Sequence, residues 1–309
     1  MPRARRACVI AALCGRALLG LIGANGAAHA QDMEPRAYSA APIGTNFIVT
    51  NYSRTTGAVS LDPSLPIANV KASINTGALA YERTFDLFGQ TASAAIAVPF
   101  LDAKISGDVF EASRQISRTG LGDIRFRFAE NLIGGPSLTP SEFAQRQPVT
   151  TLGLSLSVLA PTGDYNPQHL VNISSHRWAI KPEIGVSQPL GAWFADVAAG
   201  PWFFTDNGDF FRGHTRGEDP LWTVQAHTGY NFRPGLWLAV DATHYFGGQT
   251  ILDGVNKHDF ESATRYGVTL SLPLAPGWAA KVAWASWLTA HNGGGYDTLT
   301  FALQYRWFD

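Results

Sequence analysis

Residues 151–160 read TLGLSLSVLA, and every second side chain over most of this stretch is large and apolar. Leu152, Leu154, Leu156 and Val158 share one face of an extended chain, while threonine, glycine and serine occupy the other face. A helix would scatter both sets around its axis. The period of two therefore predicts a β-strand with one apolar face and one small polar face.

The same alternation recurs outward from this stretch to both ends of the chain. Residues 298–308, TLTFALQYRWF, again alternate large apolar side chains with threonine, alanine, glutamine and arginine. About twelve such segments can be placed, with boundary errors of about two to four residues. They are expected at 45–53, 72–84, 90–100, 120–131, 149–160, 177–188, 192–204, 220–232, 236–247, 260–272, 278–289 and 297–308.

The connections between these segments alternate between tight turns and long polar loops. Tight turns are expected at 85–89, 189–191, 233–235 and 275–277. Long loops are expected at 54–71, 101–119, 161–176, 205–219 and 248–259, with a shorter one at 290–296. Only 132–148 breaks the rule, as a medium loop where a tight turn is due.

Tight turns at one rim and long loops at the other are typical of transmembrane barrels. The predicted fold is all-β, a transmembrane antiparallel up-and-down β-barrel of about 12 strands over residues 45–309. The tight turns are expected to face the periplasm.

The first 30 residues are expected to be a cleaved signal peptide. Arginines near the start precede an apolar stretch, and Ala28-His29-Ala30 places small residues at both positions that the peptidase reads. Cleavage after Ala30 would release an exported chain, and the outer membrane is its expected location. Cys8 and Cys14 both lie in this leader, so the mature chain is expected to hold neither a disulfide nor a cysteine metal site.

Residues 31–44 form a separate N-terminal segment ahead of the first predicted strand. Two interpretations stay open for it. The segment folds into the lumen as a plug, or it hangs in the periplasm as an untied terminus. Chain ends are untied by default, so the periplasmic tail is the preferred interpretation.

Composition excludes several classes of function. The formal net charge of -1 offers no basic stripe that could release counterions from nucleic acid, so nucleic-acid binding is not expected. The histidines form no His-x-x-x-His or Glu-x-x-His pair, and no phosphate-cradling glycine loop opens a helix. No cofactor and no transition-metal site are predicted. The run 206–209 offers oxygen ligands without EF-hand spacing, so a turn is the preferred role and calcium binding stays open.

Charged side chains gather on the polar faces of the predicted strands. In a membrane barrel this face lines the lumen, whereas in a soluble barrel it would be the solvated exterior. Aromatic residues near strand ends favour the membrane interpretation, because interfacial girdles lie there. These are Trp178, Trp193, Trp284, Tyr245 or its neighbours, Tyr266, Tyr305 and Trp307. The predicted lumenal charges, expected to be selectivity elements and not catalysts, are Arg83, Asp123, Arg125, Arg127, Lys181, Glu183, Asp196, Asp241, Glu261, Arg265, Lys281 and Arg306.

The chain ends on a strand whose last residues are Trp307, Phe308 and Asp309. Apart from the final aspartate, this ending resembles the carboxy-terminal sorting signal of outer-membrane proteins. The resemblance implies the barrel-assembly machinery and outer-membrane lipid as partners.

Several motifs together resemble a family of outer-membrane barrels that is labelled meta-pathway of phenol degradation. They are RAYSAAPIGTNF at 36–47, YERTFDLFG at 81–89, GLGD at 120–123, APTGDY at 160–165 with Asn172 and Trp178, and YFGG at 245–248. These motifs span nearly the whole mature chain. The resemblance implies an outer-membrane channel that admits aromatic or other hydrophobic compounds, and it does not imply catalysis.

Three hypotheses follow for function. The first is a channel for passive uptake of small, aromatic or hydrophobic solutes. The second is a structural or adhesion barrel whose lumen is closed, since twelve strands are near the size at which side chains can fill a barrel. The third is an outer-membrane lipid hydrolase that uses Ser174, Ser175 and His176, a weak match because a histidine beside serines in a polar loop is usually solvated.

Overall fold

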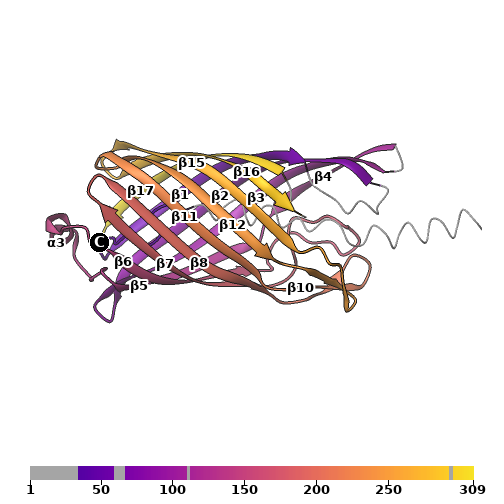
Figure 1. Ribbon diagram of the computed structural model, residues 1–309, viewed down its shortest axis with the longest axis horizontal. Helices are drawn as coiled ribbons and strands as arrows, with labels where there is room; N and C mark the ends of the chain where they lie inside the picture. The colour runs from indigo at the N-terminus through magenta and orange to yellow at the C-terminus, as the bar shows by residue number, and fades with distance from the viewer. Residues whose placement is uncertain (1–33, 59–66, 110–111, 292–294) are drawn as a thin grey trace, which may run out of the picture.

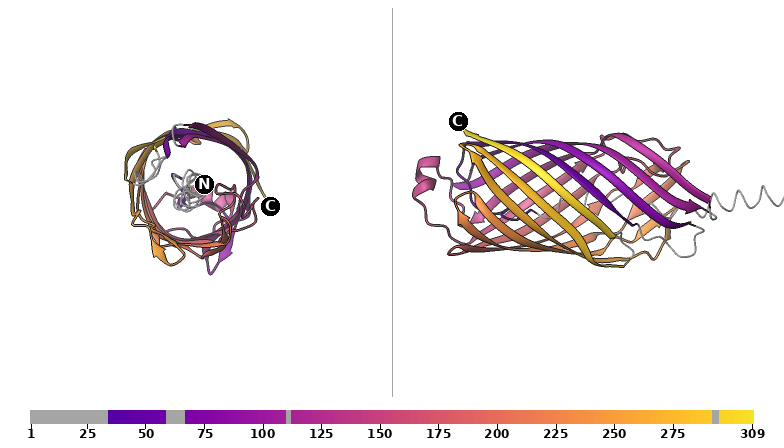
Figure 2. Two further views of the ribbon diagram at one scale, coloured as in Figure 1. Left: turned by 90° about the vertical axis from the view of Figure 1, so that its right-hand side faces the viewer. Right: turned by 90° about the horizontal axis from the view of Figure 1, so that it is seen from above.

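The computed structural model describes residues 34–58, 67–109, 112–291 and 295–309. Long strands run obliquely around one axis (Figure 1), and the view along that axis shows a closed ring (Figure 2). The ring is an antiparallel barrel of 12 strands, as the sequence predicts. In the part of the chain that the structure describes, no helix is long and apolar enough to cross a membrane.

The barrel strands follow one another around the wall in chain order. They are β1 (Thr45–Ala58), β2 (Ile67–Leu87), β3 (Gln90–Val109), β4 (Ala112–Leu121), β5 (Ile124–Ile133), β6 (Thr151–Ala160), β7 (Ala179–Leu190), β8 (Trp193–Phe204), β11 (Leu221–Arg233), β12 (Leu236–Gly247), β15 (Glu261–Ala275), β16 (Trp278–His291) and β17 (Gly295–Phe308). β4 and β5 both pair with β3 and count as one wall strand. β1 pairs with β17, which closes the ring.

The apolar face of each strand points outward. On β6, Leu154 and Leu156 are 44% and 43% exposed, whereas Ser155 and Ser157 are 7% and 3% exposed. This is the reverse of a soluble barrel, whose apolar face is hidden inside. Lipid is the solvent that suits such an exterior, and the small polar residues then face the lumen.

Two of the predicted long loops are shorter than expected. The structure extends β1 and β2 into 54–71, and it extends β3 and β4 into 101–119. The β3–β4 pairing runs from Phe100 opposite Leu121 to Val109 opposite Ala112. The prediction was wrong here because backbone pairing continues between polar side chains, which break the apolar alternation without ending the strand.

The predicted strand at 120–131 is bent at Gly122 and Asp123, between β4 and β5. The Gly122 amide still donates to the Pro99 carbonyl at 2.9 Å, and a Cβ at Gly122 would meet the side chains of Pro99 and Leu101 within 3 Å. A glycine therefore lets the wall bend without a gap in packing.

One rim carries the tight turns and the medium loop. Gly191 and Gly235 hold φ angles of +67° and +80° in two of these turns, a conformation that favours glycine. The predicted loop 132–148 contains one short helix, α3 (Pro140–Gln145), with a capping box between Thr139 and Glu142. The C terminus lies at this rim too (Figure 1).

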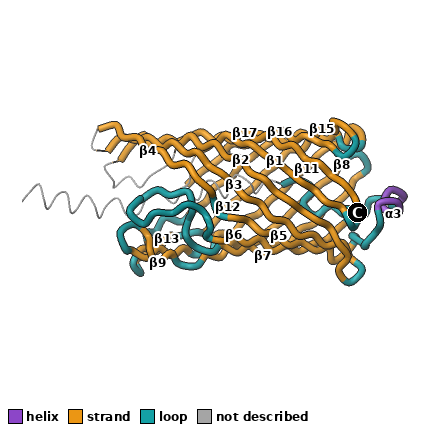
Figure 3. The backbone as a smooth tube through the Cα atoms, turned by 180° about the vertical axis from the view of Figure 1, so that it is seen from behind, coloured by secondary structure: helices purple, strands orange, loops and turns teal. Residues whose placement is uncertain are grey.

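The opposite rim carries the long loops, which hold a second small sheet. Its strands are β9 (Asn207–Phe210), β10 (His214–Glu218), β13 (Thr250–Leu252) and β14 (Val255–Asn256). Figure 3 shows these elements at the end of the barrel opposite α3. By the usual arrangement of membrane barrels this is the external mouth.

Candidate functional site: the barrel lumen and its mouth

A layer of charged and polar side chains crosses the middle of the lumen. Lys181 and Glu183 on β7 form a buried ion pair of 2.6 Å. His227 Nδ1 on β11 lies 2.7 Å from Asp241 on β12, whose other carboxylate oxygen accepts a 2.7 Å hydrogen bond from Thr269 on β15. Buried charges need partners at close range. This layer therefore ties neighbouring strands together across the inner wall.

The described part of the N-terminal segment, residues 34–44, reaches into this layer. The backbone amide of Arg36 donates to the Asp196 carboxylate on β8 at 2.8 Å. Its guanidinium donates to the Asn231 side chain on β11 at 2.9 Å. The preferred expectation of a periplasmic tail is thus corrected: these residues lie inside the barrel, where side chains of the inner wall accept their hydrogen bonds.

Tyr38 is the most closely fitted residue of this segment. Its hydroxyl lies 2.8 Å from the Ser155 hydroxyl on β6 and donates to Glu183 on β7 at 2.7 Å. Its ring occupies a slot between Gly153 and Gly185, which are directly paired on β6 and β7. A Cβ would approach the ring to 2.7 Å at Gly153 and to 2.2 Å at Gly185. Only glycine at these two positions leaves room for the ring.

Arg125 and Arg127 on β5 lie beside this segment. The Arg127 guanidinium carbon is 5.6 Å from the centre of the Tyr38 ring, and Arg125 donates to the Ser157 hydroxyl at 3.4 Å. Both arginines line a polar cavity together with Lys181, Glu183, Asp196, His227 and the N-terminal segment. The structure therefore brings five of the predicted lumenal charges to one place.

Four more predicted charges are on the inward face but do not line this cavity. Arg265 is buried, donates to the Thr298 hydroxyl at 3.3 Å and lies 5.2 Å from the Trp287 ring. Asp241 belongs to the charged layer through its contacts with His227 and Thr269. The Lys281 ammonium lies 5.9 Å from the centre of the Trp237 ring. Glu261, the first residue of β15, lies on the same inward face of this strand as Arg265.

Three predicted charges are near the rims. The alternation of β17 places Arg306 on the inward face, but its side chain is exposed at the periplasmic rim. Its guanidinium carbon lies 5.4 Å from the centre of the Phe308 ring. Arg83 was placed in the lumen wrongly: it lies on the outward face beside Tyr81 and forms an ion pair with Asp309. Both of these charges are about half exposed at the rim. Asp123 lies at the β4–β5 bend and binds the mouth loops instead of lining the lumen.

Aromatic residues line the lumen on both sides of the charged layer. Towards the mouth, Trp202, Tyr245 and Trp287 form one cluster. Towards the periplasmic rim, Phe194 and Trp237 meet edge to face with ring centres 5.8 Å apart. Sequence reasoning missed both clusters.

The strand alternation does predict that these aromatic residues face inward. Phe194 shares the alternation of Asp196, and Tyr245 shares that of Asp241, so each belongs to a polar face. The predicted girdle position was Tyr245 or one of its neighbours. The structure buries Tyr245 completely and gives the outward position to Phe246.

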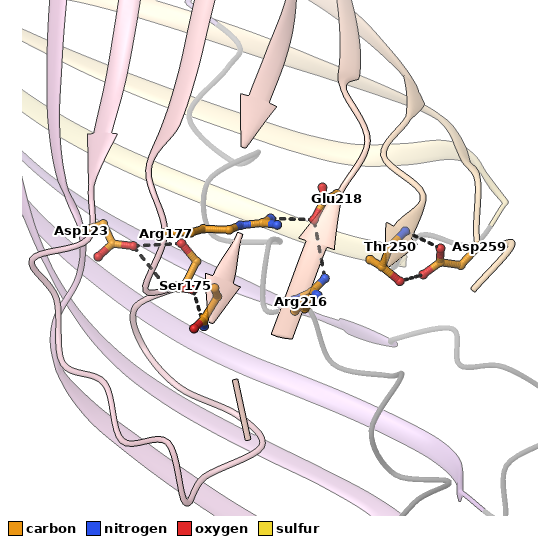
Figure 4. A network of polar contacts seen from close by, with 8 residues as sticks. Asp123, Ser175, Arg177, Arg216, Glu218, Thr250 and Asp259 are labelled. Atoms are coloured by element: carbon orange, nitrogen blue, oxygen red, sulfur yellow. Dashed lines mark hydrogen bonds and ion pairs between the residues drawn. The ribbon is translucent and has the colours of Figure 1, made fainter. Parts of the chain in front are cut away.

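A second ionic network holds the mouth loops together. Arg177 donates to Glu218 on β10 at 2.6 Å, and Arg216 lies 3.6 Å from the same carboxylate. Figure 4 shows the two arginines converging on Glu218, with Asp123 and Ser175 on one side and Thr250 with Asp259 on the other. Desolvation lowers the pKa of Arg216, with Glu218 acting against that shift and Arg177 adding to it.

The Ser174, Ser175 and His176 cluster belongs to this loop architecture. The Ser174 hydroxyl donates to Asp123 at 2.6 Å, and the Ser175 hydroxyl donates to the other Asp123 oxygen at 3.3 Å. The His176 ring stacks on Tyr165 with ring centres 4.3 Å apart. Among the described contacts, none joins a serine hydroxyl to the His176 ring, so the geometry of a hydrolase is not formed here.

The run 206–209 likewise serves the loops. The Asn207 amide donates to the Tyr165 hydroxyl at 3.0 Å and to the Ser175 carbonyl at 3.1 Å, and its oxygen accepts from the Asp209 amide at 3.0 Å. Within the described ranges, no group of three His, Cys, Asp or Glu side chains could hold a metal ion.

The lipophilic exterior, the closed ring and the polar interior define an outer-membrane type of β-barrel. The family described as "Putative MetA-pathway of phenol degradation" matches residues 48–303. The chain belongs to this family, which confirms the resemblance seen in its motifs.

Solved structures agree with this fold. An outer membrane channel from Pseudomonas putida F1 is 23% identical, with a TM-score of 0.76 over 89% of this chain and 99% of that chain. The β domain of the Bordetella autotransporter BrkA is 11% identical, with a TM-score of 0.47 over 86% of this chain and 100% of that chain. The first likeness shows the fold, and the second is too distant to support an argument. No curated protein sequence matches the chain.

Proposed function

We propose that the protein is a channel through which small aromatic or hydrophobic compounds cross the outer membrane by passive diffusion. The observation that carries this proposal is the pair of lumenal aromatic clusters, Trp202 with Tyr245 and Trp287 near the mouth, and Phe194 with Trp237 near the periplasmic rim. Each ring faces the lumen although lipid on the other side of the wall would accept it. The clusters make the inner wall apolar on both sides of the charged layer. Trp202 and Tyr245 are buried among their neighbours, and the partly exposed Trp287 offers a stacking surface near the mouth.

The charged layer would then act as the selectivity element between the two clusters. Lys181 forms an ion pair with Glu183, and His227 Nδ1 lies 2.7 Å from Asp241, while Arg125 and Arg127 face the same cavity. Paired charges narrow a pore and penalise ions that cannot replace their hydration. Neutral aromatic solutes do not meet that penalty.

The family description supports the aromatic class of solute, since it names a pathway of phenol degradation. We also propose that the chain acts without catalysis, is exported with cleavage after Ala30, and reaches the outer membrane through the barrel-assembly machinery. The outward apolar side chains on every strand pair support that location.

Swelling of proteoliposomes tests the proposal. Phenyl glucoside and methyl glucoside are both retained by lipid, and only the first carries an aromatic ring. The proposal predicts that phenyl glucoside swells the vesicles at least as fast as methyl glucoside despite its larger size. No swelling by either solute, or a rate that follows size alone, would overturn it.

A structural barrel with a closed lumen is the second candidate, and the N-terminal segment in the lumen favours it. This candidate predicts neither swelling nor single-channel conductance, including when Tyr38 is replaced.

A further inference from the structure

A histidine lies between two carboxylates in the charged layer of the lumen. In the antiparallel pairing of β11, His227 is directly opposite Asp196 on β8 and directly opposite Asp241 on β12. Residues in such positions place their Cβ atoms about 4.5 to 5.5 Å apart, so the three side chains are close neighbours on the inward face. The side chains of His227 and Asp241 are only 4% and 1% exposed, and the imidazole Nδ1 is 2.7 Å from Asp241.

Asp196 is the carboxylate that holds the N-terminal segment. Its Oδ2 accepts the 2.8 Å hydrogen bond from the Arg36 amide. Its Oδ1 is buried and has no hydrogen-bond partner among the described residues. Burial lowers the pKa of Arg36, and the negative charge of Asp196 acts against that shift. Asp196 therefore binds the segment with one oxygen and has a second oxygen that can accept a further donor.

Protonation of His227 would create that donor. A carboxylate only accepts, so Nδ1 of the neutral ring carries the proton shared with Asp241, and Nε2 has none to donate. A proton taken up from the lumenal water adds an N–H at Nε2 and a positive charge to the ring. Histidine is the side chain whose charge ordinarily changes between about pH 5 and 8. The protonated ring would thus find Asp196 directly opposite, with one oxygen unoccupied.

The charges around His227 leave Asp196 as the available partner. Glu183 is already bound by Lys181, by Gln225 at 3.0 Å and by the Tyr38 hydroxyl at 2.7 Å. The charged and titratable groups around His227 are Arg125 and Arg127 on β5, Lys181 and Glu183 on β7, Asp196 on β8, Asp241 on β12, Arg265 on β15, and Glu34, Arg36 and Tyr38 of the N-terminal segment.

We propose that His227 is a pH-dependent switch: when its ring is protonated it takes Asp196 as a partner and releases the N-terminal segment from the lumen. The imidazolium and the Arg36 guanidinium then compete for one buried carboxylate, which disfavours the docked segment. By linkage, docking of the segment weakens proton binding at His227 by the same factor. Acid therefore widens the lumen. This consequence rests on the proposed channel function, whereas the position of the segment can be measured without transport.

The test follows the segment by thiol labelling of the mature protein in detergent micelles. Both cysteines of the chain precede residue 31, so Ser39→Cys gives the mature chain a single thiol on the segment. Its reaction rate with a bulky thiosulfonate is divided by that of Ser141→Cys, an exposed residue of α3, to remove the pH dependence of the thiol itself. This ratio should rise by about 5- to 150-fold between pH 8 and pH 5, the usual range of coupling between two sites.

Substitutions assign the response to His227. His227→Gln keeps a donor for Asp241 and cannot take up a proton, so its ratio should stay within about 2-fold over the same range. His291→Gln is the matched control, because this exposed histidine at the end of β16 should leave the response intact. Asp196→Asn keeps an acceptor for the Arg36 amide and removes the charge, so it should raise the ratio at pH 8 and abolish the response. Heat-modifiable migration on gels confirms that each variant is folded.

Two results would overturn the switch. One is a ratio that does not change with pH in the wild-type background, and the other is a response that survives in His227→Gln, or in Asp196→Asn should the first variant not fold. Failure of the channel is a separate outcome. Release of the segment in acid without any vesicle swelling refutes the channel and leaves the switch, and swelling with labelling that ignores pH refutes the switch and leaves the channel.

Discussion

Replacing Tyr38 with alanine should release the N-terminal segment from the lumen and raise the open fraction of the channel. The tyrosine hydroxyl makes two hydrogen bonds, at 2.8 Å to Ser155 and 2.7 Å to Glu183, and its ring lies 5.6 Å from the Arg127 guanidinium. A neutral hydrogen bond contributes about 1 kcal/mol and one to a charged group about 2 kcal/mol. The cation–π contact adds about 0.5 to 1 kcal/mol. The ratio of docked to undocked segment should thus fall by roughly 100- to 1,000-fold.

Single-channel recording in planar bilayers measures this change as longer or larger openings of the Tyr38→Ala variant. Gly185→Ala should act in the same direction, because its Cβ would stand 2.2 Å from the Tyr38 ring. Gly77→Ala is the matched control, since a Cβ at Gly77 meets nothing within 4 Å. Wild-type conductance and open time in both the Tyr38 and the Gly185 variants would refute the reasoning.

Three further predictions concern the lumen and the rim. Replacing Arg125 and Arg127 together by glutamate should shift the reversal potential in a salt gradient towards cation selectivity, and an unchanged potential would count against their role in the lumen. Trp287→Ala, which removes the partly exposed ring of the mouth cluster, should slow phenyl glucoside swelling by about 2- to 10-fold relative to methyl glucoside; equal slowing of both solutes would contradict a stacking role. The capping box of α3 should weaken in acid. Hydrogen bonds from Thr139 lower the pKa of Glu142 below that of a free glutamate. The ionised carboxylate therefore stabilises the helix fully at pH values above the pKa of a free glutamate. This stabilisation is lost as the pH falls through the lowered pKa of Glu142. Amide exchange in the first turn of α3 should accelerate over that range in the wild type and not in Glu142→Gln, which lacks the titrating carboxylate.

The strands could be predicted because lipid on one side and a polar lumen on the other impose a strict alternation. Leu154 and Ser155 illustrate this rule, and their faces are as the sequence indicated. The ends of β1 to β4 could not be predicted in the same way. Beyond the lipid band both faces meet water, so backbone pairing persists without an apolar signal.

Placement of single residues was harder to predict than the strands. Arg83 follows Tyr81 on an outward face, and only its position at the rim lets a charge stay there. The N-terminal segment shows no periodicity at all. Its place in the lumen depends on the absence of side chains at Gly153 and Gly185, which the sequence shows only once their pairing and the ring of Tyr38 are known.

Quenching of tryptophan fluorescence by brominated lipids tests most directly whether lipid touches the apolar faces while the lumen excludes it. Two variants of the reconstituted mature protein would each retain one tryptophan, either Trp284, which faces outward at 38% exposure, or Trp237, which faces the lumen at 6%. The structure predicts strong quenching of Trp284 and little quenching of Trp237. Equal quenching of the two, or an unquenched Trp284, would contradict the arrangement of the barrel wall.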